Sequence, residues 1–571
     1  MDLFLIDATG PFFCGYGRKR INWSKIPFTH LDAAGPDDWA AMECELRQFA
    51  DAVAAQGYNA VSLDDLAHLA AHPLHEPELA RRIAGFRSRF IRFFDLLRDD
   101  YGLRVYLTSD VLPLTPALAA HFGGDEPALA DYYHGLVCGV LDDFPQLAGL
   151  ILRIGESDGN DVRDPLRTSL FVRNAAQANR LLARLLPEFE QRGKDLIFRT
   201  WTVGAHRIGD LIWHRDTLAD TLKGLDSPRL IVSMKHGESD FFRYLPLNQA
   251  FFNVKARKLL ELQARREYEG AGEYPSFIGR ECEDFARELA GVENMAGISV
   301  WCQTGGWHRF RRRAFLENDG RDVWIRLNTA AAIGVFKHHQ SAAQAVATVT
   351  GPERAAATLA LLNEATEVIR ELLYVPEFAR QKLFFRRVRI PPLLHVYWDS
   401  LFINHAVRKV MRHFVRDPAA ALHSAGEAMS RFPRMIEHAR EAELPVEDIE
   451  HLRDFGYLLL LARRYYFEPF SEALVTEIRN AKKAYKQHWP ASERQRYRVK
   501  LSFLPLPFRS RTLALAAAIL LRRRRGYRLL LDRLITLRLA GVAWRALRPR
   551  DPAAMPKFLR KSAMGVDALF K

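Results

Sequence analysis

The chain has 571 residues, of which 48% are hydrophobic and 26% are charged, and its formal net charge is +14 at pH 7. These values are typical of a folded globular protein with several structural units, and they exclude a chain that is disordered throughout. Much of the positive excess lies near the C-terminus, which predicts a basic tail with its own partner. No zinc-finger, RNA-recognition or helix-turn-helix signature indicates a nucleic-acid partner.

The cysteines and the N-terminal residues indicate in which cellular compartment the protein is expected. No two cysteines form a CxxC pair, which argues against a disulfide framework and against structural zinc. The opening residues, MDLFLIDATGPFF, place an aspartate inside the apolar run and include neither a basic lead nor a small-residue cleavage site. No run reaches the roughly 18 apolar residues that a membrane-spanning helix needs. We therefore expect a cytoplasmic protein. The cysteines are Cys14, Cys44, Cys138, Cys282 and Cys302.

Up to about residue 340, short apolar runs alternate with amphipathic helical stretches such as Asp38–Gln56 and Asn174–Arg192. Regular alternation of this kind, with about eight repeats, is typical of a (β/α)8 TIM barrel. We expect this catalytic barrel, an α/β fold, to span residues 1–340. The predicted strands are Ile26–His30, Tyr58–Leu63, Arg104–Thr108, Gly149–Ile154, Leu196–Thr200, Leu230–Met234, Pro275–Ile278 and Gly297–Trp301.

Beyond residue 340 the strand signals fade, and segments divided by prolines have helical patterns. We expect a mostly α-helical C-terminal domain over residues 341–490 and a basic amphipathic helical tail over residues 491–571. The predicted helices of the domain are Glu353–Leu373, Ala419–Arg431, Val446–Tyr466 and Glu472–His488.

The tail contains a short apolar run, Leu513–Leu521, followed by the four arginines 522–525 and a leucine-rich, arginine-studded stretch. A segment of this kind can lie in a membrane interface with its arginines toward anionic headgroups. Residues 509–550 are therefore a candidate for peripheral contact with the inner face of the cell membrane. The alternative is a buried helix whose arginines pair with acidic groups on the barrel or on a second subunit of a homodimer.

Charged and aromatic side chains follow four of the predicted strands. In a barrel, the carboxyl ends of the strands converge on one mouth, where catalytic residues are carried. We therefore expect these groups to line one pocket. The four segments are Leu152–Glu156, Phe198–Trp201, Lys235–Asp240 and Trp301–Gln303.

The region KHGESDFFRYLPLNQAFFNVKARKLLELQARREYEG resembles a segment of the family 67 glycoside hydrolases, the α-glucuronidases. In that segment a K-x-G-x-x-D-F run is followed, at nearly the same separation, by E-L-Q-x-x-x-E-Y-x-G. ILRIGESDG resembles the strand end that bears the family's general acid, and FRTW resembles a strand that bears a uronate-binding arginine. The resemblance covers residues 140–310, and too few residues precede the first predicted strand for the β-sandwich domain that comes before the barrel in the family.

Carried over residue by residue, the resemblance implies that Glu156 is the general acid and that Asp240 and Glu267 share the base role by activating water. It also implies that Arg199 and Lys235 hold the carboxylate of the substrate. Inversion at the anomeric carbon is a further implication of the resemblance.

One position departs from the family. Leu152 stands where the family has a lysine in the acid-bearing strand, and Arg153 lies next to it as a third candidate contact to the uronate. The aromatic candidates for stacking on a sugar are Trp201, Trp301 and Trp307, although core packing explains the first two equally well.

The chemistry of glycoside hydrolysis agrees with this assignment. One carboxylic acid protonates the leaving oxygen, and an opposing carboxylate directs water or attacks the ring. Arginine and lysine pair with an acidic substituent, arginine by a planar fork and lysine as a point charge. Neither a cofactor nor a metal is expected.

Simpler structural roles remain open for the same residues. Glu156 could brace its own loop, Asp240 could be a salt-bridge partner of Lys235, and Glu267 could be an exposed helix residue. Exposed pairs of that kind contribute about 0–1 kcal/mol. His236 and His308 are expected to be hydrogen-bonded structural histidines.

The sequence thus predicts a glycoside hydrolase, α-glucuronidase-like, that cleaves a terminal uronic acid or related acidic sugar from an oligosaccharide or polysaccharide. One alternative is a catalytically inactive carbohydrate-binding or scaffold protein of a membrane-associated polysaccharide system. Another is a glycosidase that acts on a non-uronic sugar of a bacterial surface polysaccharide.

Overall fold

Eight parallel strands close into a barrel in the order β1-β10-β9-β8-β7-β5-β3-β2. The computed structural model describes residues 1–16, 26–154, 165–168, 171–202, 211–212, 215–303, 312–317, 319–385, 388–397, 399–503, 521–522, 542 and 546. The strands are β1 (Leu3–Asp7), β2 (Ala60–Leu63), β3 (Arg104–Asp110), β5 (Leu147–Arg153), β7 (Asp195–Arg199), β8 (Leu230–Lys235), β9 (Arg257–Gln263) and β10 (Met295–Trp301). The predicted eight-stranded barrel is confirmed.

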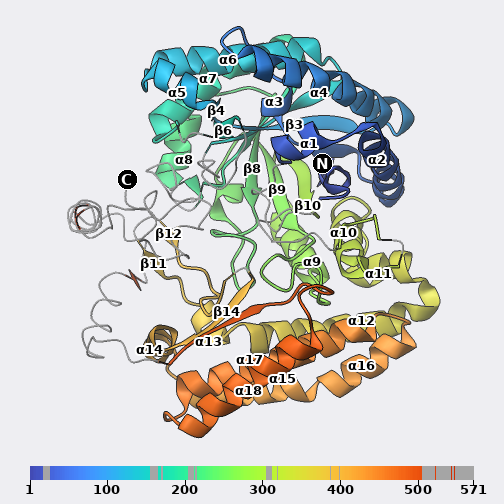
Figure 1. Ribbon diagram of the computed structural model, residues 1–571, viewed down its shortest axis with the longest axis vertical. Helices are drawn as coiled ribbons and strands as arrows, with labels where there is room; N and C mark the ends of the chain where they lie inside the picture. Colours follow the sequence, from blue (N-terminus) through green and yellow to red (C-terminus); the bar gives the residue numbers. More distant parts are fainter. Residues whose placement is uncertain are drawn as a thin grey trace.

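Helices surround this barrel (Figure 1), because most of its strands are followed by an α-helix on the way to the next parallel strand, whereas β8 and β9 are joined by a loop with a short 3-10 helix, Gln249–Phe252. The expected helices at 38–56 and 174–192 are confirmed as α2 and α7. The helices of this part are α1 (Phe28–Ala33), α2 (Pro36–Gln56), α3 (Leu66–Leu69), α4 (Pro77–Asp95), α5 (Pro116–Phe122), α6 (Glu126–Asp143), α7 (Ala175–Gln191), α8 (Arg215–Leu222), α9 (Gly279–Leu289) and α10 (Val323–Phe336).

Two of the eight predicted strands were wrong. The predicted strand at 26–30 overlaps helix α1, and the first strand is instead β1, whose LFLID run is buried at every position. The seventh strand is β9, whereas none of residues 275–278 belongs to a strand. The sequence of β9, RKLLELQ, was not recognised as a strand because charged residues interrupt its apolar pattern. Lys258 and Glu261 nevertheless lie buried in the barrel wall.

The helices that follow the barrel form a layer at the other end of the molecule, in which α12, α15, α16, α17 and α18 lie side by side (Figure 1). All four predicted helices of this part are present, and the first of them ends in a short π-helical turn, Ile369–Leu373. The helices are α11 (Ala342–Thr350), α12 (Pro352–Val368), α13 (Pro376–Ala379), α14 (His405–Phe414), α15 (Pro418–Ser430), α16 (Phe432–Glu441), α17 (Val446–Phe467) and α18 (Glu472–His488).

The barrel and the helical layer share buried contacts. The apolar core of the layer includes Tyr268, from the loop after β9, and Trp324 of α10. Asp448 of α17 accepts hydrogen bonds from both terminal nitrogens of Arg312, at 2.6 and 2.8 Å, and from the Trp324 indole at 2.6 Å. Arg494 joins the same cluster and donates to Glu273 at 3.0 Å. The layer is therefore fixed against the loop that follows β9.

Short strands form small sheets outside the barrel. β13 (Val396–Tyr397), β14 (Ser400–Asn404) and β15 (Arg498–Ser502) form one sheet, and β11 (Phe384–Phe385), β12 (Val388–Arg389) and β16 (Leu521–Arg522) form another. A two-stranded pair joins β4 (Pro113–Leu114) to β6 (Arg167–Thr168). β15 and β16 lie within the range predicted as a helical tail, so at these residues that prediction was wrong. Most of residues 509–550 lies outside the described residues.

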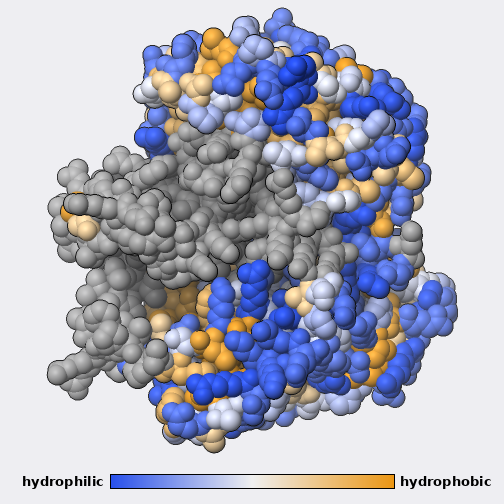
Figure 2. Space-filling model, viewed as in Figure 1, coloured by the Kyte–Doolittle hydropathy of each residue, from blue (hydrophilic) through white to orange (hydrophobic). Residues whose placement is uncertain are grey.

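The visible surface of the helical layer is mainly hydrophilic, with apolar residues scattered among polar ones (Figure 2). This matches helices that turn their apolar faces toward a shared core. No helix in the described ranges combines the length and the hydropathy that crossing a bilayer requires.

Candidate functional site

The loops after β8 and β9 bring two of the predicted catalytic carboxyl groups into one electrostatic environment. Asp240 lies in the loop after β8, and Glu267 lies in the loop after β9, the neighbouring strand. Both side chains are buried, at 8% and 3% exposure of the residue. Glu267 is therefore not an exposed helix residue, which was the simpler structural interpretation of this position.

Asp240 is held as a carboxylate. Its Oδ1 accepts hydrogen bonds from the Lys235 ammonium at 2.5 Å and from the backbone N–H of Phe241 at 2.9 Å, and its Oδ2 accepts one from the Tyr268 hydroxyl at 2.5 Å. Burial by itself favours the neutral acid, but the Lys235 charge and these hydrogen bonds outweigh it and lower the pKa of Asp240 below its usual value. Asp240 is thus the salt-bridge partner of Lys235, and the pair is buried.

Glu267 has the opposite tendency. Burial, followed by the charge of Asp240, raises the pKa of Glu267 to about 8, although Lys235 acts in the other direction. Gln263, the last residue of β9, accepts a hydrogen bond at 2.9 Å from the backbone N–H of Glu267 and so fixes this turn to the strand end. At neutral pH the pair therefore carries one negative charge, on Asp240, and one proton, on Glu267.

Lys235 lies against aromatic rings. Its Nζ is 3.5 Å from the centroid of the Trp201 ring and 4.4 Å from that of Phe241. Trp201 is half-buried and also packs against Phe384 of β11 and Ile212. A cation, Lys235 at the end of β8, and an aromatic ring, Trp201 just after β7, therefore lie near the Asp240 carboxylate.

Arg199 and Trp301 are engaged inside the barrel. The Nε of Arg199 donates to both carboxylate oxygens of Glu261 at 3.0 Å, and the same carboxylate accepts from Ser233 at 2.7 Å and from the Trp301 indole at 3.2 Å. The Arg199 guanidinium also lies over the Trp301 ring, at 4.5 Å from its centroid. Arg199 was predicted to bind the carboxylate of a substrate. In the structure it binds the carboxylate of Glu261, a residue of β9.

Arg153 likewise has protein partners. Its Nε is 2.7 Å from Asp110, at the end of β3, and its Nη2 is 4.0 Å from Asp64, which follows β2. Thr108 donates to Asp64 at 2.7 Å. Burial raises the pKa of Asp64 to about 7, while Arg153 lowers it and the carboxyl group of Asp65 adds to the rise. This part of the barrel end thus holds a second group of buried carboxyl groups.

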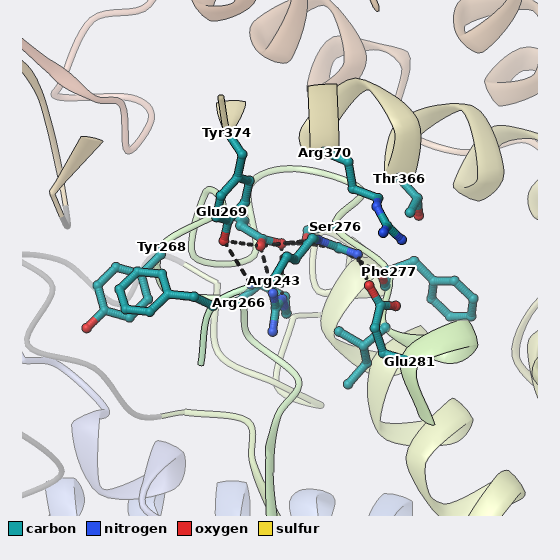
Figure 3. A network of polar contacts seen from close by, with 12 residues as sticks. Arg243, Arg266, Tyr268, Glu269, Ser276, Phe277, Glu281, Thr366, Arg370 and Tyr374 are labelled. Carbon is teal, nitrogen blue, oxygen red and sulfur yellow. Dashed lines mark hydrogen bonds and ion pairs between the residues drawn. The ribbon is translucent and has the colours of Figure 1, made fainter. Parts of the chain in front are cut away.

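A buried network fixes the two loops that carry the carboxyl pair (Figure 3). At its centre, Glu269 accepts hydrogen bonds from Arg243 at 3.1 and 3.2 Å, from Arg266 at 2.7 and 3.1 Å, and from the Tyr374 hydroxyl at 2.7 Å. Ser276 also donates to it. Burial opposes ionisation, but the two arginines prevail and lower the pKa of Glu269 to about 2. The network joins the β8 loop to the β9 loop. Its Arg243 is three residues after Asp240, and its Glu269 is two residues after Glu267.

Three predicted positions lie outside the described residues: Glu156, Trp307 and His308. His236 is described, and its Nε2 lies 3.2 Å from the carbonyl of Phe242 while its ring stacks on Phe285. Burial lowers the pKa of His236 to about 4, in agreement with the expected structural histidine.

Sequence reasoning missed several buried carboxyl groups at the barrel end. Asp7 at the end of β1 accepts a hydrogen bond from the backbone N–H of Gln303 at 3.1 Å, and burial raises its pKa to about 6. Asp64 and Asp110 were not singled out either, and Glu261 was noted in the E-L-Q motif but given no role. The signal for these aspartates was their place at the end of a strand, and Asp7 was missed because the first strand had been assigned to the wrong segment.

The chain matches no family model and no curated protein. Among solved structures, a GH138 enzyme targeting pectin rhamnogalacturonan II is 10% identical over 86% of this chain and 61% of that one, with a TM-score of 0.49. CpGH89 from Clostridium perfringens, in complex with GlcNAc-alpha-1,4-galactose, is 8% identical over 85% of this chain and 53% of that one, with a TM-score of 0.41. The O-GlcNAc hydrolase of Thermobaculum terrenum is 10% identical over 87% of this chain and 92% of that one, with a TM-score of 0.37.

These three proteins are glycoside hydrolases, and this chain spans less than two thirds of the length of the first two. Since every TM-score is below 0.5 and every identity is 10% or less, the likenesses assign neither a family nor an activity to this chain.

Proposed function

We propose that the protein is a glycoside hydrolase that removes a terminal uronic acid or related acidic sugar from a glycan at the carboxyl end of the barrel. The observation that carries this proposal is the buried Asp240 and Glu267 pair, in which one group is ionised and the other protonated at neutral pH. Glycoside hydrolysis by inversion requires an ionised carboxylate that activates the attacking water, besides a separate acid for the leaving oxygen, and in this proposal the pair supplies the water-activating side of the site.

The protonation states divide the base role that the resemblance to α-glucuronidases gives to both residues. Asp240 carries the charge, so it accepts the proton of the attacking water. Glu267 carries a proton, so it donates a hydrogen bond that orients the water. Glu156, outside the described residues, is the proposed acid that protonates the leaving oxygen, and the outcome is inversion.

Lys235 and Trp201 support an acidic sugar as the substrate. An aromatic ring such as Trp201 stacks on the apolar face of a sugar, and the Lys235 ammonium, which lies over that ring and already pairs with Asp240, is the cation that would attract a carboxylate substituent. Trp301, Trp307, Arg153 and Arg199 are the further proposed substrate contacts.

A second candidate is a glycosidase for a non-uronic sugar. It is favoured by the ion pairs that the three cations make, Arg199 with Glu261, Arg153 with Asp110 and Lys235 with Asp240, because each cation already has a carboxylate partner within the protein. In that enzyme Lys235 serves to keep Asp240 ionised.

The experiment is a hydrolysis screen on matched pairs of oligosaccharides that differ only in a terminal uronic acid or its neutral counterpart. Proton NMR follows the anomer that is released first. The proposal expects turnover of the uronic member with inversion, and Glu156→Gln and Asp240→Asn should each reduce kcat by at least about 100-fold. An exposed control, Asp284→Asn on α9, should retain full turnover.

Turnover of the neutral members alone would favour the second candidate. Binding of acidic glycans without any product would contradict both and would favour the inactive binding protein. If Glu156→Gln retained ordinary activity on a substrate that the parent hydrolyses, Glu156 would lose its role as acid.

A further inference from the structure

Outside the barrel mouth, three side chains of different chemistry converge between two outer helices. His134 and Cys138 are four residues apart on α6 and so lie on the same face of that helix. Glu188 of α7 lies opposite them, and one ligand atom from each residue falls within a common span of 4.8 Å. The three residues are half-buried. Imidazole nitrogen, thiolate sulfur and carboxylate oxygen are the three ligand types that Zn²⁺ takes from proteins.

The separations fit a tetrahedral ion. Zinc bonds of about 2.0–2.3 Å at tetrahedral angles place a nitrogen about 3.3 Å from an oxygen ligand and about 3.6 Å from a sulfur ligand. The Nε2 of His134 is 3.2 Å from the Oε1 of Glu188 and 3.6 Å from the Sγ of Cys138, and the Nδ1 of the same ring is 3.8 Å from that sulfur. Nε2 thus lies at both separations that a shared ion imposes, and on binding the imidazole ring turns so that Nδ1 moves away from the sulfur.

The surrounding charges fit as well. The second oxygen of Glu188, Oε2, accepts a hydrogen bond from Arg192 at 2.7 Å, which leaves Oε1 directed toward His134. Arg192 also donates to Asp142 at 2.7 Å, so its own charge has a counterion. A carboxylate ligand fixed by an outer hydrogen bond is the usual arrangement around bound zinc. With a thiolate and a carboxylate, a divalent ion gives a neutral centre.

We propose that His134, Cys138 and Glu188 form a binding site for a divalent transition metal of the zinc type, which joins α6 to α7 on the outside of the barrel. The protein supplies three ligands, so a water completes the tetrahedron. On binding, the thiol of Cys138 releases its proton to solvent. Glu188 lies fifty residues from Cys138 in the sequence, so local spacing does not reveal this group. The site is independent of the proposed hydrolase activity.

The test uses the full chain, freed of metal with a chelator and titrated with Co²⁺ as a spectroscopic probe. The expected result is saturation at one equivalent with a thiolate-to-cobalt charge-transfer band, which Zn²⁺ displaces. Cys138→Ser should abolish the band, and His134→Ala should weaken binding at least about tenfold. Cys44→Ser, which removes an exposed cysteine of α2, should behave like the parent.

A second measurement separates a lost site from a lost fold. Zn²⁺ should raise the Tm of the parent and of Cys44→Ser, because an ion that binds only the folded state stabilises it. It should leave the Tm of Cys138→Ser unchanged, while circular dichroism of that variant matches the parent. The proposal is overturned if no band forms in the parent, or if the band persists in Cys138→Ser.

Discussion

Burial and the neighbouring carboxylate of Asp240 together raise the pKa of Glu267 to about 8, while Lys235 keeps Asp240 itself ionised. The two groups therefore titrate as a unit that holds one proton and one charge at neutral pH. This relationship depends on Lys235 at the end of β8 and on one carboxyl group from each of the loops after β8 and β9, and it gives the first two predictions.

Asp240→Asn should lower the pKa of Glu267, because it removes the like charge that helps to raise it and leaves the Lys235 ammonium without its partner. The carbonyl stretch of a protonated carboxylic acid in infrared difference spectra reports this titration. In the parent a band should disappear near pH 8, in Asp240→Asn that band should disappear at a lower pH, and in Glu267→Gln no band should titrate near pH 8. A band that titrates at the same pH in the parent and in Asp240→Asn would disprove the electrostatic coupling.

The raised pKa of Glu267 also makes stability depend on pH. Between about pH 4.5 and 8, folded Glu267 keeps a proton that the unfolded chain has released, so its contribution is complete below pH 4.5 and is lost as pH rises toward 8. The slope should reach up to about 1.4 kcal/mol per pH unit. Urea unfolding over this range should show the slope in the parent and a smaller one in Glu267→Gln. Identical slopes would mean that Glu267 does not hold the proton.

Breaking the Arg199–Glu261 pair should be costly, because both groups are buried in the barrel. Arg199→Met leaves the Glu261 carboxylate with hydrogen bonds but no counterion, and the expected loss is about 3–5 kcal/mol in the free energy of unfolding. Adding Glu261→Gln to this variant removes the stranded charge and should recover part of the loss. Arg287→Met, which breaks an exposed pair with Asp284, is the control and should change little. A double variant as unstable as Arg199→Met would argue against a charge effect.

Glu269 should stabilise the loops of the site only where it is ionised. Its folded pKa of about 2 lies below the value of 4.5 for an unperturbed glutamate, so its contribution is present above pH 4.5 and is lost as pH falls from 4.5 toward 2. The difference corresponds to about 3 kcal/mol. Guanidinium unfolding of the parent should show this acid loss, and Glu269→Gln should lack it while being less stable at neutral pH. An equal acid loss in both proteins would assign it to other carboxyl groups.

Local patterns were sufficient for most of the regular elements. The helices at 446–467 and 472–488 were predicted almost to the residue, because an apolar stripe at helical spacing and proline breaks are properties of neighbouring residues. The strands β8 and β10 were found from short buried apolar runs. β9 was missed because Glu261 looks like a surface residue in sequence, although Arg199, 62 positions away, compensates its charge inside the barrel.

The sequence by itself determined the barrel, most of its strands and the fact that ionisable groups follow them. Only the tertiary structure decided which of those groups meet: that Asp240 is ionised beside Lys235, that Glu267 holds a proton, and that Arg199 pairs with Glu261. The physical reason is that hydrophobic periodicity is local, whereas burial and charge pairing depend on residues that the chain brings together from distant strands. The protonation of a carboxyl group is set by those neighbours and cannot be derived from its place in the sequence.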